Sequence, residues 1–89
     1  MENFIKIDSV MNEKYFVLYR IENNKIIFRI DNVEKTYIIK EKSKYYFRPL
    51  KNIILCYSIE RLKKGLENPS MNYHNIQVVK EALGFKSNL

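Results

Sequence analysis

The stretch Lys14–Asp31, KYFVLYRIE-NN-KIIFRID, decides the fold because it predicts a β-hairpin with a defined register. Two runs rich in aliphatic and aromatic residues flank Asn23-Asn24, and asparagine tolerates the positive φ of a two-residue type I′ turn. Closing the turn there pairs Glu22 with Lys25, Ile21 with Ile26, Tyr19 with Phe28, and Val17 with Ile30. One face is then apolar throughout: Tyr15, Val17, Tyr19, Ile21, Ile26, Phe28 and Ile30. A shift of one residue would break this face, so the turn and the pattern agree.

The next segment extends this hairpin into a sheet. Asp31-Asn32 offers a second turn of the same kind, which pairs Ile30 with the first residue of a following strand and places Arg29 opposite Glu34. The core face then gains two residues and one polar exception: Tyr37, Ile39 and Lys35.

The segment before Pro49 has two interpretations. Residues 45–48 form a further strand, or they lead in extended form into a helix, because proline disfavours a helical conformation at the preceding residue. The expected strands are about 3–8, 14–22, 25–31, 33–41 and, in the first interpretation, 45–48.

The period of the apolar residues becomes helical from Lys51. One helix is expected over about 51–64, with Gly65 in the left-handed conformation that ends it and Pro69 beyond. A second helix over about 72–83 ends in the same way at Gly84. The apolar stripes of the two helices are Leu55, Ile59, Leu62 and Leu66, and then Ile76, Val79 and Leu83.

These elements predict one α+β domain over residues 1–89: a four- or five-stranded antiparallel meander followed by two helices packed on one face. Apolar residues make up 46% of the chain, which is enough for a core. No stretch approaches the roughly 20 apolar residues that span a bilayer, so a cytoplasmic location without membrane contact is expected. The single cysteine, Cys56, has apolar neighbours and is expected in the core.

The positive charge is concentrated in one third of the chain. Residues 35–64 carry nine Lys or Arg against two acidic residues, and aromatic residues stand directly among these cations. Cations neutralise phosphates and aromatic rings stack on bases, so this segment predicts a nucleic-acid or partner-binding surface. Its candidate residues are Lys40, Lys42, Lys44, Tyr45, Tyr46, Arg48, Lys51, Tyr57, Arg61 and Lys64. The alternative is structural: Tyr45 or Phe47 points into the core, and the lysines protect an edge strand.

The sheet face opposite the core is a second candidate surface. It mixes apolar and basic residues where a solvated face would be more uniformly polar. Its interface candidates are Phe16, Leu18, Arg20, Ile27, Arg29 and Ile38. Three interpretations stay open: the first strand or residues 42–50 fold over this face, the face binds a partner or a second copy, or the sheet curls into a small barrel that buries it.

The sequence offers little for catalysis, metal ions or cofactors. Zinc needs four Cys or His ligands, whereas this chain has Cys56 and His74 on different elements. The two glycines are better explained as helix ends than as a phosphate loop. A metal-independent ribonuclease built from His74, a tyrosine and a basic residue is the enzymatic alternative, but any chain rich in tyrosine and lysine offers this trio. No catalytic residue, metal or cofactor is expected.

Two functional hypotheses follow. The first is a small non-enzymatic nucleic-acid-binding protein that uses residues 40–64, with a homodimer as one further expectation. The second is an inhibitor or accessory factor of a phage or mobile element, of the anti-defence, anti-CRISPR-like kind, which binds a host protein of a nucleic-acid-handling system. Two observations motivate the second hypothesis. The chain is rich in Ile, Lys, Asn and Tyr, whose codons are rich in A and T, and it is compact without a set of residues arranged for catalysis.

Overall fold

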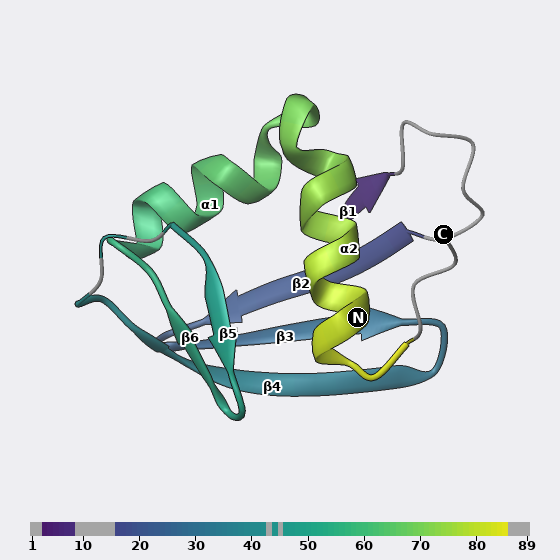
Figure 1. Cartoon of the computed structure of the whole chain (residues 1–89), viewed down its shortest axis with the longest axis horizontal. Coiled ribbons are helices and arrows are strands. Elements are labelled where there is room, and N and C mark those ends of the chain that lie inside the picture. The colour runs from purple at the N-terminus through teal and green to yellow at the C-terminus, as the bar shows by residue number, and fades with distance from the viewer. Residues whose placement is uncertain (1–2, 9–15, 43, 45, 86–89) are drawn as a thin grey trace.

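Six strands form one sheet in a computed structural model of the chain, which describes residues 3–8, 16–42, 44 and 46–85 (Figure 1). The strands follow the spatial order β1-β2-β3-β4-β6-β5. Their bounds are β1 Ile5–Asp8, β2 Phe16–Glu22, β3 Lys25–Ile30, β4 Val33–Lys40, β5 Arg48–Leu50 and β6 Ile53–Leu55. Two helices follow, α1 (Ile59–Glu67) and α2 (Asn72–Ala82), joined by the short 3₁₀ helix η1 (Pro69–Met71). The α+β class, with a mostly antiparallel sheet before two helices, is confirmed.

The two hairpins have the register that the sequence predicts. Tyr19 lies opposite Phe28 in the β2–β3 pair, and Arg29 lies opposite Glu34 in the β3–β4 pair. Asn23 and Asp31, the first residues of the two turns, both have a φ of +54°, which asparagine and aspartate tolerate better than most residues. Tyr15 and the start of the predicted strand 14–22 lie outside the described residues.

The predicted helix over 51–64 is wrong in its first half. Residues Ile53–Leu55 form β6, which pairs in parallel with β4 and places Ile38 opposite Ile53. β5 pairs with the outer side of β6, so the further strand lies at 48–50 rather than at 45–48. Apolar residues suit a buried strand as well as a helix. Here the strand prevails because the backbone groups of this segment bond to β4, for example Cys56 N–H to the carbonyl oxygen of Lys40 at 3.0 Å.

The end predicted for the first helix at Gly65 is also wrong, because α1 continues to Glu67. Gly65 instead gives room to Tyr46, since a Cβ atom on Gly65 would lie 2.5 Å from the Tyr46 ring. The corresponding prediction for the second helix is confirmed: Gly84, just beyond α2, has a φ of +88°.

The hydrophobic core lies between one face of the sheet and the two helices, which sit together on that side (Figure 1). Phe28 and Phe47 stack there with ring centroids 5.7 Å apart, and Cys56 is fully buried as expected. Neither helix lies on the other face of the sheet, which is called the open face below.

Candidate binding surface on the open face of the sheet

The open face carries a cluster of aliphatic residues with basic neighbours over β3, β4, β6 and β5. The strand register sets Lys25, Ile38, Ile53 and Leu50 side by side, and Lys40, Leu55 and Arg48 form the next row. Ile38 and Leu50 are each 44% exposed, and Ile53 and Leu55 are half-buried. These seven residues are called the basic aliphatic patch.

The charge of this patch is positive and incompletely compensated. It contains three cations and no acidic residue. Within the described part of the chain, Lys25 and Lys40 form no ion pair with a carboxylate. Both lysines are exposed, so the patch presents a positive potential to a partner.

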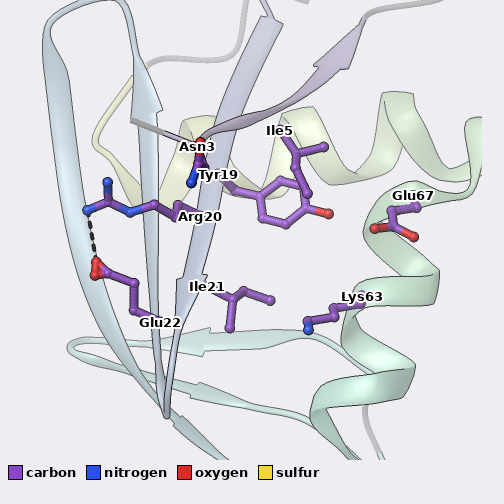
Figure 2. A pocket seen from close by; sticks show the side chains of 8 residues that line it. All are labelled: Asn3, Ile5, Tyr19, Arg20, Ile21, Glu22, Lys63 and Glu67. Carbon is purple, nitrogen blue, oxygen red and sulfur yellow. Dashed lines mark ion pairs between the residues drawn. The ribbon is translucent and has the colours of Figure 1, made fainter. Parts of the chain in front are cut away.

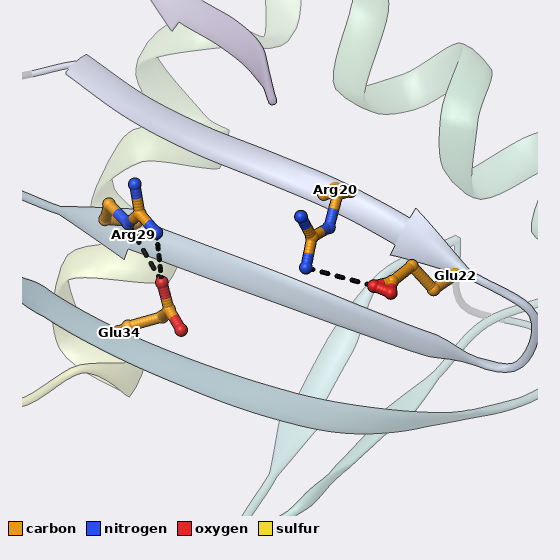
Figure 3. Close-up of polar contacts among 4 residues, drawn as sticks. All are labelled: Arg20, Glu22, Arg29 and Glu34. Carbon is orange, nitrogen blue, oxygen red and sulfur yellow. Dashed lines mark hydrogen bonds and ion pairs between the residues drawn. The ribbon is translucent and has the colours of Figure 1, made fainter. Parts of the chain in front are cut away.

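The other half of the open face, over β1, β2 and the adjoining part of β3, is different because its cations are already paired. Arg20 and Glu22 form an ion pair at 3.0 Å, and Arg29 and Glu34 form one at 2.7 Å (Figure 3). The guanidinium of Arg29 also bonds Glu34 through Nε at 2.9 Å. A second basic surface is therefore not available here without breaking these pairs.

Aromatic rings also contact the cations in this half of the open face. The Phe4 ring lies 5.0 Å from the Arg20 guanidinium and 4.4 Å from that of Arg29, and Lys6 Nζ lies 4.5 Å from the centre of the Phe16 ring. Phe4 directly precedes β1 and contributes to covering this half of the open face. Five of the predicted interface residues belong to this half and one to the basic aliphatic patch: Phe16, Leu18, Arg20, Ile27 and Arg29, and then Ile38.

The structure separates the predicted basic-aromatic residues. Tyr46 is structural, because its hydroxyl donates a hydrogen bond to Asn75 Oδ1 at 2.5 Å and its ring packs on Gly65. Lys51 does not join the other predicted residues, because it lines a separate hollow together with residues of α2. Lys64 forms an ion pair with Glu60 at 3.5 Å. Tyr45 lies outside the described residues.

The remaining predicted residues gather where β4 ends and α1 begins. Glu41 joins these elements, since its carboxylate accepts a hydrogen bond from Ile59 N–H at 2.8 Å. Tyr57 is 60% exposed here, with the Arg61 guanidinium 5.1 Å from its ring centre. Lys40 and Lys42 flank Glu41 here, and Arg48 lies in the same row of the sheet as Lys40. Lys44 is exposed.

Sequence reasoning missed two features of the surface. Ile53 and Leu55 belong to the basic aliphatic patch, which the sequence analysis did not predict because it assigned both residues to a helix. The adjacent β-branched residues Ile53 and Ile54 favour a strand and were the available signal. A cavity between β2 and α1, which Tyr19, Lys63 and Glu67 help to line, had no signal in the sequence because its walls come from separate elements.

The described residues contain no group of three or more His, Cys, Asp or Glu side chains that could hold a metal ion. Among them there is also no helix with the length and apolar character needed to cross a membrane. The chain matches no protein-family model, no curated protein and no solved structure.

Proposed function

We propose that the protein is a non-enzymatic binding module that docks its basic aliphatic patch on a partner protein. The observation that carries this is the exposure of Ile38 and Leu50 between cations with no acidic residue among them. Exposed apolar side chains that adjoin one another mark interaction sites on monomeric proteins. Complementarity then calls for a partner with apolar side chains surrounded by carboxylates.

The composition of the patch favours a protein over a nucleic acid. Its centre is aliphatic, and aliphatic side chains offer contact area but no ring on which a base can stack. Two of the aromatic residues that the sequence places among the cations lie inward instead, since Phe47 is in the core and Tyr46 packs against α1. These observations support the second functional hypothesis, in which the protein is an inhibitor or accessory factor that binds a host protein.

Selection from a random peptide display library tests the chemistry of the partner directly. We expect peptides enriched on the wild-type protein to combine aliphatic residues with Asp or Glu and to lose binding to Ile38→Glu. Val33→Glu is the matched control, because Val33 is on the same strand, is 41% exposed, and lies opposite the buried Ile30 rather than in the patch.

Two results would contradict this function. One is enrichment of basic peptides, or of none, on the wild-type protein. The other is equal loss of binding in Ile38→Glu and Val33→Glu, which would show a nonspecific effect of added negative charge. Circular dichroism of both variants establishes that they remain folded, as expected for exposed positions.

A second candidate function is nucleic-acid binding at the junction of β4 and α1. The specific observation is the exposed Tyr57 ring with Arg61 beside it, next to Lys40 and Lys42. A ring of this kind can stack on a base while the surrounding cations contact phosphates.

Electrophoretic mobility shifts with single-stranded DNA and RNA at two salt concentrations test this second candidate. We expect binding that weakens as salt rises and is lost in Tyr57→Ala, but is retained in Tyr73→Ala, which removes an exposed tyrosine of α2. Absence of a shift at low salt excludes this function, because phosphate contacts are strongest there.

A further inference from the structure

A cavity of about 430 Å³ opens between β2 and α1 (Figure 2). Ile5 and Ile21 provide apolar walls, and Tyr19, Lys63 and Glu67 bring polar groups to it. Both charged residues are exposed and Ile5 is 47% exposed, so the cavity is accessible from solvent.

The Tyr19 hydroxyl is the most unusual group of this cavity. Tyr19 is only 1% exposed, yet its hydroxyl has no hydrogen-bond partner among the described residues. Figure 2 shows this hydroxyl directed toward the carboxylate of Glu67, the group that interacts with it most closely in the cavity. Burial, and secondarily Glu67, raises the pKa of Tyr19 to about 12. The hydroxyl therefore keeps its proton at neutral pH and directs it toward Glu67.

Lys63 and Glu67 supply opposite charges that do not neutralise each other. They are four residues apart on α1, a spacing at which ion pairs commonly form, but no ion pair joins them. Glu60 and Lys64 on the same helix, at the same spacing, do pair at 3.5 Å. The cavity thus offers a ligand the carboxylate of Glu67 as an acceptor and, separately, the ammonium group of Lys63 as a donor.

We propose that this cavity binds a small zwitterion with an aliphatic body, of which a free aliphatic amino acid is the simplest example. Glu67 accepts hydrogen bonds from the ammonium group of the ligand, while Lys63 donates to its carboxylate. Its hydrocarbon part packs against Ile5 and Ile21, where it removes apolar surface from water. This site is independent of the basic aliphatic patch and of the function proposed for it.

Titration of the whole chain with three related compounds, followed by ¹H–¹⁵N NMR, tests the proposal. The compounds are leucine, leucinamide, which lacks the carboxylate, and N-acetyl-leucine, which lacks the ammonium group. We expect leucine to shift the amide signals of Ile5, Ile21 and Glu67, with a Kd about tenfold lower than that of either derivative. Absence of shifts at these residues up to about 10 mM leucine would overturn the proposal, leaving a cavity that holds only water.

Charge-neutral variants assign each contact. Lys63→Gln should weaken leucine and N-acetyl-leucine but leave leucinamide unchanged, and Glu67→Gln should weaken leucine and leucinamide but leave N-acetyl-leucine unchanged. Lys64→Gln is the control that leaves all three affinities unchanged. Equal losses for all three compounds in Lys63→Gln and Glu67→Gln would contradict recognition by charge.

Discussion

Tyr46 contacts both helices, α1 through its ring and α2 through its hydroxyl. The ring lies against Gly65 of α1, and the hydroxyl bonds the fully buried Asn75 of α2. Asn75 Nδ2 in turn donates to the carbonyl oxygen of Gly65 at 3.1 Å. A buried polar group that loses such a partner costs about 1–3 kcal/mol, so this three-residue network fixes how α1 and α2 meet.

Gly65→Ala tests this network by steric conflict. Alanine favours an α-helix over glycine by about 1 kcal/mol, but here its Cβ atom would collide with the Tyr46 ring. We therefore expect the free energy of unfolding in urea to fall by about 1–3 kcal/mol. In a Tyr46→Ala background the same substitution should be neutral or stabilising, and an equal loss in both backgrounds would show that the ring is not the cause.

Tyr19→Phe and Tyr46→Phe each remove one hydroxyl, but they should change the free energy of unfolding in opposite directions. The Tyr19 hydroxyl is buried without a partner, so its removal should raise the free energy of unfolding by about 1 kcal/mol. Tyr46→Phe leaves Asn75 Oδ1 without its donor and should lower it by about 1–2 kcal/mol. Urea unfolding of both ligand-free variants measures the difference, and a loss in Tyr19→Phe would contradict an unpartnered hydroxyl.

At the scale of elements, local sequence patterns were enough to predict strand pairing where each strand pairs with its neighbour in the sequence. The turns at Asn23 and Asp31 and the alternation along β2 and β3 define a register that the structure confirms. β6 pairs instead with β4, across the whole of β5, and no local signal marks such a pairing. The helical spacing of Leu55 to the apolar residues of α1 is a coincidence, because Leu55 lies in β6.

Ser58→Ala distinguishes the observed start of α1 from the start predicted near residue 51. Ser58 is the N-cap residue, and its hydroxyl oxygen accepts a hydrogen bond from Arg61 N–H at 3.1 Å. We expect its loss to lower the free energy of unfolding by about 1 kcal/mol in urea. In the interior of a longer helix the same change would be stabilising, since alanine is the better helix former. A gain in stability would therefore contradict the observed start.

At the scale of the whole molecule, the buried Tyr19 and Tyr37, the half-buried Tyr46 and the buried cysteine make folding sensitive to alkaline pH. Burial raises the pKa of Tyr19, Tyr37, Tyr46 and Cys56. A group with a raised pKa in the folded state stabilises the fold fully below its unfolded pKa, and loses this contribution as pH rises through the folded value. For Tyr19 this window runs from 10.0 to about 12.

We therefore expect the free energy of unfolding to decline progressively above about pH 9, where the cysteine of the unfolded chain begins to ionise. Urea unfolding between about pH 8 and pH 11 measures this decline. It should be smaller in Tyr19→Phe, which lacks one of the ionising groups. A stability that stays constant over this range would contradict the burial of these side chains.

The binding surfaces were only partly visible in the sequence. Lys40 and Arg48 were recognisable as cations of a basic segment, but their position beside Leu55 depends on the pairing of β4, β6 and β5. The aromatic residues of the segment were ambiguous, because a ring between lysines suits both stacking and the core. Tertiary packing decided this for Tyr46 and Phe47, in favour of the interior.

The insertion of β6 between β4 and β5 has a consequence for the order of folding. The β1–β4 meander uses only short connections and can form early, whereas β6 must find β4 across a longer loop, which is entropically slower. Until then β4 is an unpaired edge that carries the adjacent apolar residues Tyr37, Ile38 and Ile39, the kind of strand that recruits other chains. Lys35 and Lys40, near the two ends of β4, then act as gatekeepers against aggregation of the nascent protein.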